Sequence, residues 1–211
     1  MVGKLRSRGK LKVIAIGSSS TAGIGASSPG ATYPSQFEGI LEKAFLGLDV
    51  VIKNRGVSGE QAATTSDRLK TQVALENPDL VLWQVGTNDA LARVPVESFT
   101  ETVRETVTWL KQHRIDVVLV GLQYTPKVAR DEYYAAIRAA LHKVAVAENV
   151  LLVRRFEAME FLDRIKAGEL LDSDGLHLND LGYHCMAEHV ARAVVVSAFL
   201  KPTLKPSAAA Q

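Results

Sequence analysis

The chain of 211 residues has little cysteine, no excess of one charge and no long hydrophobic run. A single cysteine, Cys185, excludes an internal disulfide framework and cannot form a cysteine-based zinc site alone. The 25 Lys and Arg residues against 23 Asp and Glu give a net charge of +2. No stretch approaches the roughly 20 apolar residues that cross a bilayer. We therefore expect no nucleic-acid partner and no membrane partner.

The N-terminal region imitates a signal peptide, because several basic residues precede an apolar run. That run, Val13–Ile16, ends after four residues at Gly17, whereas the apolar region of a signal peptide needs about 7 to 15. We interpret the run as the first β-strand. The compartment is left open: cytoplasmic as the chain stands, and periplasmic or secreted if a leader has been removed from it.

The composition is that of an ordinary globular protein. Hydrophobic residues make up 47% and charged residues 23% of the chain, so a sizeable core can form. No linker or internal repeat divides the sequence. We expect a basic and flexible segment over residues 1–10, a single domain over residues 11–200, and a flexible tail over residues 201–211 that holds Pro202 and Pro206. On the last helix, Cys185 is expected to be a small buried thiol.

Short apolar runs alternate with segments of helical periodicity. The runs lack polar alternation, which is typical of strands covered on both faces. They are Leu11–Ile16, Leu48–Ile52, Leu80–Val85, Val117–Val120 and Val150–Val153. Apolar stripes over residues 37–45, 103–110 and 137–147, and a segment from about Asp180 to Phe199, predict helices. This order predicts a three-layer, flavodoxin-like α/β fold with a doubly wound parallel sheet of about five strands.

Small and polar residues follow the predicted strands. In an open parallel sheet, ligands bind beyond the carboxyl ends of the strands. The segments expected at that edge are residues 17–23, 54–59 and 86–89, with residues 172–177 ahead of the last helix. The functional site is therefore predicted there.

These segments hold the groups that hydrolysis of an ester through a serine requires. The reaction needs a hydroxyl nucleophile, an imidazole base, a group that orients the imidazole, and donors for the oxyanion. A serine follows the first strand. Asp174 lies three residues before His177, so one turn can aim the carboxylate at Nδ1. Gly56 can present a backbone N–H and Asn88 a side-chain amide.

Four blocks resemble, in order, those of the SGNH hydrolases, also called the GDSL esterase/lipase family. They are Gly17–Thr21, Asn54–Gly59, Gly86–Asp89 and Asp174–His177. The resemblance implies Ser19 as nucleophile with Asp174 and His177 completing a catalytic triad. It also implies an oxyanion hole of Ser19, Gly56 and Asn88. Neither a metal nor a cofactor is implied.

The sequence departs from the family at two positions. Ser18 stands where the family usually has Asp, and Leu178 where Pro often follows the histidine. The hydroxyls of Ser18 and Ser20 leave the choice of nucleophile open. Each block also has a structural interpretation: a serine N-cap, a surface turn at the Asp–His pair, and an Asx turn at Asn88.

The leading hypothesis is a serine esterase that cleaves carboxylic esters of small molecules, with short, acetyl-like acyl groups, through an acyl-enzyme. Tyr124 and Leu91, in short loops after the fourth and third strands, are predicted to contact the substrate. Alternatives are a thioesterase or lysophospholipase on longer chains and a carbohydrate acetylesterase. A different class is a non-catalytic module that binds an anion at a helix N-terminus. The sequence predicts no oligomeric state.

Overall fold

The computed structural model describes residues 5, 9–166 and 168–200. The predicted tail at residues 201–211 lies outside the described residues, as does most of the predicted segment 1–10. Lys10, the last residue of that segment, already begins the first strand.

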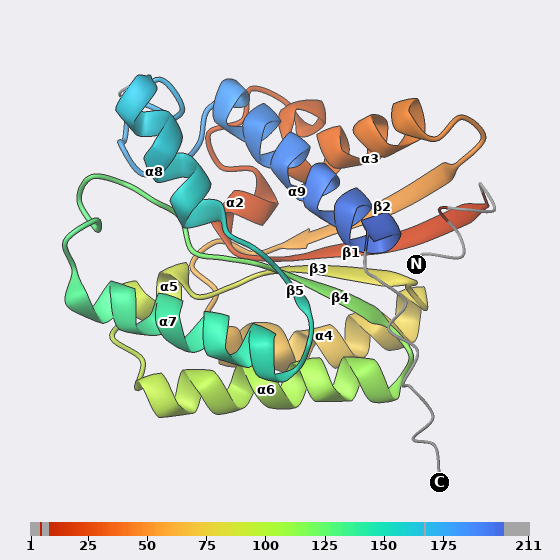
Figure 1. The fold of residues 1–211 in the computed structure, drawn as a ribbon, viewed down its shortest axis with the longest axis horizontal. Coiled ribbons are helices and arrows are strands. Elements are labelled where there is room, and N and C mark those ends of the chain that lie inside the picture. The colour runs from red at the N-terminus through yellow and green to blue at the C-terminus, as the bar shows by residue number, and fades with distance from the viewer. Residues whose placement is uncertain (1–4, 6–8, 167, 201–211) are drawn as a thin grey trace, which may run out of the picture.

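Five parallel strands form one sheet (Figure 1). Their bounds are β1 (Lys10–Gly17), β2 (Asp49–Gly56), β3 (Leu80–Gln84), β4 (Asp116–Val120) and β5 (Leu151–Val153). The spatial order is β2-β1-β3-β4-β5, and all four neighbouring pairs are parallel. The predicted doubly wound sheet is confirmed, and the order reverses at β1.

Helices cover both faces of the sheet, as Figure 1 shows. On one face lie α3 (Tyr33–Ala44), α8 (Arg155–Ile165) and α9 (Asp180–Leu200). On the other lie α4 (Ala62–Glu76), α6 (Val96–Gln112) and α7 (Glu132–Ala147). Three short elements, α2 (Ser19–Ala22), η1 (Pro29–Ala31) and α5 (Thr87–Leu91), lie in the connections. Two of these helices, α4 and α8, were not expected from the sequence.

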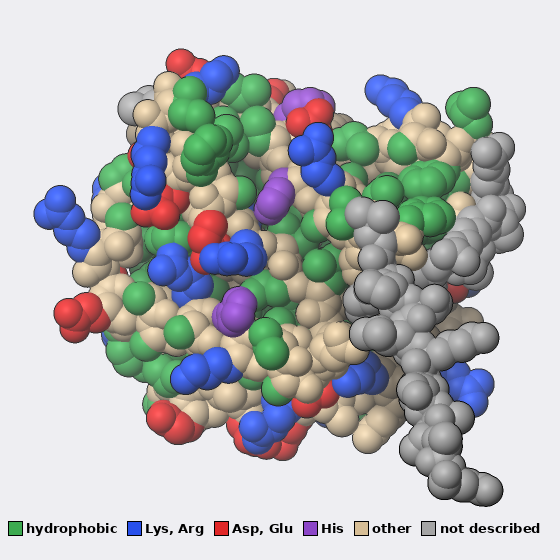
Figure 2. All heavy atoms as spheres, in the orientation of Figure 1, with side chains coloured by type: hydrophobic (Ala, Val, Ile, Leu, Met, Phe, Trp, Pro, Cys, Tyr) green, Lys and Arg blue, Asp and Glu red, His purple; other side chains and the backbone are tan. Residues whose placement is uncertain are grey.

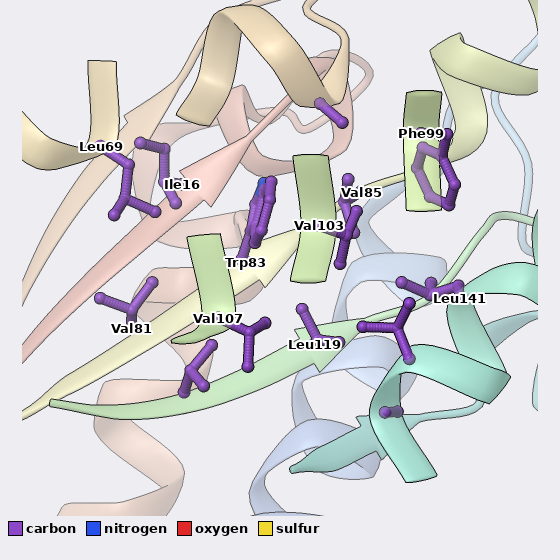
Figure 3. Packing of buried hydrophobic residues seen from close by; sticks show 14 of the residues in the cluster. Ile16, Leu69, Val81, Trp83, Val85, Phe99, Val103, Val107, Leu119 and Leu141 are labelled. Atoms are coloured by element: carbon purple, nitrogen blue, oxygen red, sulfur yellow. The ribbon is translucent and has the colours of Figure 1, made fainter. Parts of the chain in front are cut away.

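The strand side chains divide between two cores, one under each helical layer. Ile16, Val81 and Trp83 point toward α4, α6 and α7, and Figure 3 shows Trp83 beside Val103. Val13 and Leu82 belong to the opposite core. Trp83 is fully buried and packs within the first of these cores. A large buried aromatic side chain of this kind contributes strongly to the burial of apolar surface.

The described surface carries mixed charges. On the face in Figure 2, basic and acidic side chains are interspersed, without a field of one sign. Within the described part of the chain, no helix is long and apolar enough to span a membrane. Cys185 is only partly buried on α9, contrary to the expectation of full burial, and burial still raises the pKa of its thiol.

Candidate active site

Three consecutive serines follow β1, and their hydrogen bonds distinguish them. The Ser18 hydroxyl donates to Oε1 of Gln84 at 3.0 Å, and the Ser20 hydroxyl donates to Oε1 of Gln123 at 3.0 Å. Both serines are buried. Ser19 begins α2, is partly exposed, and its hydroxyl has no hydrogen-bond partner among the described residues. Ser19 is therefore the serine whose hydroxyl is available to a substrate.

Gly17, at the end of β1, makes the sharp turn into α2 possible. Its φ of +152° lies in a region that favours glycine. A Cβ there would lie 2.6 Å from the backbone oxygen of Gln84. The turn brings the start of α2 close against the end of β3, where Gln84 accepts from the Ser18 N–H at 2.9 Å.

Asp174 and His177 form a closed hydrogen-bonded turn. Oδ2 of Asp174 lies 2.5 Å from Nδ1 of His177. Oδ1 accepts the backbone N–H groups of Leu176 and His177, each at 2.8 Å. The hydrogen bond from the His177 side chain and these two N–H donors lower the pKa of Asp174 to about 2. Asp174 is therefore ionised at neutral pH and orients the imidazole, with Nε2 left for another partner.

The turn that carries His177 packs against the segment after α2. Gly25 has a φ of +89°, and a Cβ on it would lie 2.4 Å from the carbonyl oxygen of Leu178 and 3.4 Å from Cβ of His177. From the other side, the Gln123 amide donates to the carbonyl oxygen of Leu176. The histidine turn and the serine segment, about 150 residues apart in sequence, are thus neighbours in the fold.

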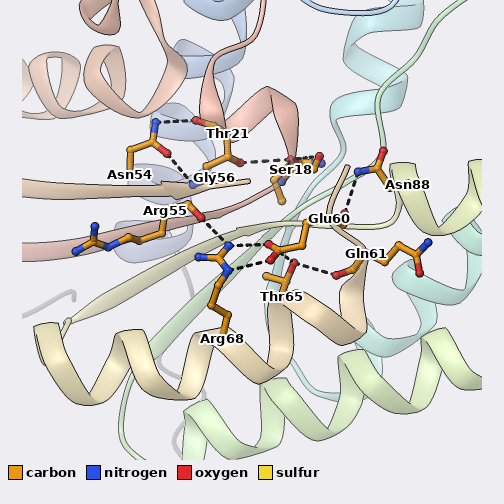
Figure 4. A network of polar contacts seen from close by, with 11 residues as sticks. Ser18, Thr21, Asn54, Arg55, Gly56, Glu60, Gln61, Thr65, Arg68 and Asn88 are labelled. Carbon is orange, nitrogen blue, oxygen red and sulfur yellow. Dashed lines mark hydrogen bonds and ion pairs between the residues drawn. The ribbon is translucent and has the colours of Figure 1, made fainter. Parts of the chain in front are cut away.

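Asn88 contacts the loop after β2. Its Nδ2 donates to the carbonyl oxygen of Glu60 at 2.9 Å, which leaves the second amide hydrogen for another acceptor (Figure 4). The predicted Asn88 amide donor is thus placed beside the loop that contains the second block.

Gly56, a predicted oxyanion donor, lies where the end of β2 meets α2. Its N–H donates to Oδ1 of Asn54 at 3.0 Å, as Figure 4 shows, so this donor is already engaged. A Cβ on Gly56 would lie 2.1 Å from the backbone nitrogen of Ala22. Gly56 therefore allows the end of β2 to pack against α2, and this geometry argues against Gly56 as an oxyanion donor.

Gly59, which the sequence analysis did not single out, has the geometry that Gly56 lacks. Its φ is +79°, and the space beside its Cα is open. Among the described residues, its N–H has no hydrogen-bond partner. It directly precedes Glu60, whose carbonyl Asn88 contacts. The signal in the sequence that could have identified Gly59 is its position as a second glycine, three residues after Gly56.

A bidentate ion pair fixes the loop that holds Gly59. Arg68 on α4 donates to both carboxylate oxygens of Glu60, at 2.9 and 2.6 Å. The same guanidinium donates to the carbonyl oxygen of Arg55 at 2.8 Å (Figure 4). The Glu60 side chain is almost fully buried, with 4% exposed, so this pair is less screened than a surface pair. The loop is held at both ends.

Asp89, next to Asn88, anchors the start of α4. Its Oδ1 accepts the backbone N–H of Ala62 at 2.9 Å. Asp89 is buried, and burial raises the pKa of its carboxyl group. The segment after β3 is thus tied to the loop after β2.

The two predicted substrate contacts differ in environment. Leu91, at the end of α5, is 48% exposed and can contact a ligand. Tyr124 packs edge-on against Phe156, and its hydroxyl donates to Asp163 at 3.3 Å. Tyr124 is therefore partly committed to α8. Within the part of the chain that the structure describes, no cluster of His, Cys, Asp or Glu side chains could hold a metal ion.

The chain matches the model of the "Non-GDSL lipase-like family" over residues 1–199. It is 28% identical to an arylesterase of Vibrio mimicus over 149 residues, which cover 71% of this chain and 72% of that protein. It is 26% identical to the esterase TesA of Pseudomonas aeruginosa over 131 residues, covering 62% and 63% of the two chains.

Solved structures share the fold. A crystal structure of TesA superposes with a TM-score of 0.75 at 22% identity, covering 87% of this chain and 97% of that one. An acetyl xylan esterase from Geobacillus stearothermophilus gives a TM-score of 0.75 at 21% identity, covering 87% and 94%. At these identities the superpositions establish the arrangement of strands and helices.

Proposed function

The chain belongs to the non-GDSL lipase-like family of SGNH ester hydrolases, and on that premise we propose that it cleaves short acyl esters through an acyl-enzyme on Ser19. Membership of the family makes the protein a carboxylic ester hydrolase. The acyl-chain preference, the assignment of the residues and the steps below are our proposal.

One observation carries the assignment of the nucleophile. The hydroxyls of Ser18 and Ser20 are committed to buried glutamines, whereas that of Ser19 is not. A nucleophile must be reachable and must be able to give its proton to a base. The Asp174–His177 pair supplies an oriented imidazole of the kind that takes such a proton.

In the proposed reaction, Nε2 of His177 takes the Ser19 proton as Oγ attacks the ester carbonyl carbon. Asp174, ionised and bonded to Nδ1, stabilises the resulting imidazolium. The imidazolium then protonates the leaving alcohol as the tetrahedral intermediate collapses to the acyl-enzyme. Water, deprotonated by His177, releases the acid and restores Ser19.

The oxyanion of the tetrahedral intermediate needs donors that are already in place. We assign the N–H of Ser19, the Nδ2 of Asn88 and the N–H of Gly59 to this role. Gly59 replaces Gly56, whose N–H is held by Asn54. The Glu60–Arg68 ion pair supports this assignment, because a loop fixed in advance pays no reorganisation energy during the reaction.

Short acyl groups are favoured by the shape of the surrounding loops. Ile24, Val57 and Leu91, from the segments after β1, β2 and β3, are each 45–48% exposed. Such side chains offer apolar contact to a small group in an open setting. A long acyl chain would need a covered groove to bury its methylenes, at about 0.8 kcal/mol each.

The alternatives make distinct predictions. A thioesterase or lysophospholipase would prefer long chains, and a carbohydrate acetylesterase would require a sugar as the alcohol. The Geobacillus acetyl xylan esterase has this fold and favours the sugar ester as the second candidate. A non-catalytic anion-binding module would hydrolyse no ester at all.

The experiment is a kcat/KM series on p-nitrophenyl esters from acetate to palmitate, with acetylated xylan as a further substrate. We expect the highest kcat/KM at two to four carbons. A maximum at eight carbons or more would contradict the short-acyl proposal.

A further inference from the structure

Gln123 is a buried glutamine that lies three residues after the end of β4. Its Oε1 accepts the hydroxyl of Ser20 at 3.0 Å, and its Nε2 donates to the carbonyl oxygen of Leu176. Ser20 directly follows the proposed nucleophile Ser19, and Leu176 directly precedes His177. One amide group therefore connects the segment of the nucleophile to the segment of its base.

The backbone of the same residue reaches a third part of the site. The N–H of Gln123 donates to Oγ1 of Thr87 at 3.1 Å, and Thr87 directly precedes Asn88. The carbonyl oxygen accepts the hydroxyl of Tyr134 at 2.6 Å, which ties the residue to α7. Gln123 thus contacts the chain neighbour of the proposed nucleophile, of its base and of an oxyanion donor.

Arg155, the first residue of α8, fixes which way the amide points. Its Nη2 donates to Oε1 of Gln123 at 2.5 Å and lies 3.4 Å from the Ser20 hydroxyl. With the amide rotated by 180°, an NH₂ group would face the guanidinium and a carbonyl oxygen would face that of Leu176. Both contacts would be repulsive, so only one orientation satisfies the neighbours.

The environment of Arg155 is unusual for a charged side chain. It is 2% exposed, and among the described residues no carboxylate pairs with it. Its other terminal nitrogen lies 3.7 Å from Sδ of Met186, and its Nε has no partner in the described structure. Burial of a cation without a counter-ion costs stability, so the Gln123 oxygen is its main polar compensation.

We propose that Gln123 is a positioning residue that holds Ser19, His177 and Asn88 in reactive alignment, and that Arg155 locks the orientation of its amide. The inference rests on the proposed function, because the alignment matters only if these residues react. A shift of about 1 Å between reacting groups can cost roughly 10²-fold in rate, so a side chain that fixes both segments influences kcat without touching the substrate.

The test is Gln123→Glu, which has nearly the same shape. The carboxylate keeps both acceptor contacts, to Ser20 and to the Arg155 guanidinium, but cannot donate to the carbonyl oxygen of Leu176. We expect the thermal midpoint to stay the same or rise. We expect kcat on p-nitrophenyl acetate, and the rate of labelling by a fluorophosphonate, to fall by about 10-fold or more, with KM within about 2-fold of the parent.

Ser20→Ala is the second variant. It removes the contacts of the α2 hydroxyl with Gln123 and Arg155 but leaves the contact of Gln123 with Leu176 in place. We expect it to lower kcat and the labelling rate several-fold, with the midpoint little changed. Gln112→Glu, the same substitution at the exposed end of α6, is the matched control and should leave all these quantities unchanged.

The possible outcomes separate the inference from the proposed function. The first case is an active parent and an inactive Ser19→Ala, with the kcat of both Gln123→Glu and Ser20→Ala within about 2-fold of the parent. In that case Gln123 is not a positioning residue, and the esterase mechanism stands. Should Gln123→Glu fail to fold, the kcat of Ser20→Ala decides by the same threshold. A parent that neither hydrolyses esters nor reacts with the fluorophosphonate overturns the proposed function, and the inference with it.

Discussion

Nδ1 of His177 lies 2.5 Å from Oδ2 of Asp174, three residues earlier, within a turn whose backbone N–H groups occupy the other carboxylate oxygen. Both carboxylate oxygens of Asp174 are thus engaged. Oδ1 accepts the backbone N–H groups of the turn, and Oδ2 contacts the imidazole. The carboxylate itself is 45% exposed, so its orienting role follows from this geometry rather than from burial.

Asp174→Asn tests this orienting role. The Asn oxygen can still accept the backbone N–H groups of Leu176 and His177, so the turn should persist. The NH₂ group would then face Nδ1 and favour the tautomer with a proton on Nε2, which cannot accept the Ser19 proton. We expect kcat to fall by about 10⁴-fold, as in other serine triads. A loss of only a few-fold would mean that Asp174 is an accessory and that Ser19 and His177 act as a dyad.

The pH profile should report the histidine and not the aspartate. Because the pKa of Asp174 is lowered to about 2, this carboxyl stays ionised through any acid limb above pH 4. A protonated imidazole cannot act as a base, so the rate should fall once His177 is protonated. The kcat/KM should therefore fall on the acid side with protonation of a single group, at pH values above those at which Asp174 titrates. An acid limb centred below pH 4 would contradict this assignment.

A lowered carboxyl pKa also has a consequence for stability. Asp174 contributes stability at pH values above its unfolded pKa of about 3.9, and the contribution is lost as the pH falls through about 2. Asp174→Asn should therefore lower the thermal midpoint slightly at pH 7, and this decrease should become smaller as the pH falls to about 2. Differential scanning calorimetry of the parent and the variant at the two pH values measures the two midpoints. A variant that loses more stability at pH 2 than at pH 7 would contradict the prediction.

Asn88→Ala removes one proposed oxyanion donor together with the contact to Glu60. Loss of a single donor typically costs about 10² to 10³ in kcat. We expect a decrease of that size with little change in KM or in the thermal midpoint, because Arg68 still holds the Glu60 side chain. An unchanged kcat in steady-state assays would remove Asn88 from the mechanism.

The two glycines of the second block should respond differently to alanine. At Gly56 a Cβ would meet the backbone of Ala22 at 2.1 Å, so β2 and α2 must separate. At Gly59 the space is open, and only the positive φ carries a cost, of about 1–2 kcal/mol. Denaturant unfolding should show a larger loss of stability for Gly56→Ala. The reverse order would contradict the packing role of Gly56.

The sheet was predictable because each strand contains an uninterrupted apolar run. All five predicted runs are strands, and β2 continues to Gly56 because it pairs with β1 through Gly17. By contrast, α4 has a polar stretch at residues 64–68 and buries few large side chains, chiefly Leu69 and Val73, so its periodicity was too weak to predict a helix. A helix at α8 was also hard to predict, because its first residue, Arg155, is charged but fully buried, whereas a helix usually buries apolar residues.

Sequence reasoning found the four blocks but could not rank the donors within them. What distinguishes Ser19 from its neighbours is the pairing of Ser18 with Gln84 and of Ser20 with Gln123, residues 66 and 103 positions away. At Gly56, the backbone N–H donates to Asn54 two residues earlier, which is why we propose Gly59 as the donor instead. The two serine contacts have no signature in the spacing of residues, because they depend on how the start of α2 meets the ends of β3 and β4.

The central claim is that Ser19 is the nucleophile, and covalent labelling tests it most directly. The protein is treated with a fluorophosphonate, digested, and the modified residue is located by tandem mass spectrometry. We predict one adduct, on Ser19, that is absent in Ser19→Ala and retained in Ser18→Ala and Ser20→Ala. Ser19→Ala should lose nearly all hydrolysis of p-nitrophenyl acetate. Its remaining rate should be about 10³-fold above that of the uncatalysed reaction in water. An adduct on Ser18 or Ser20, or full activity of Ser19→Ala, would contradict the account.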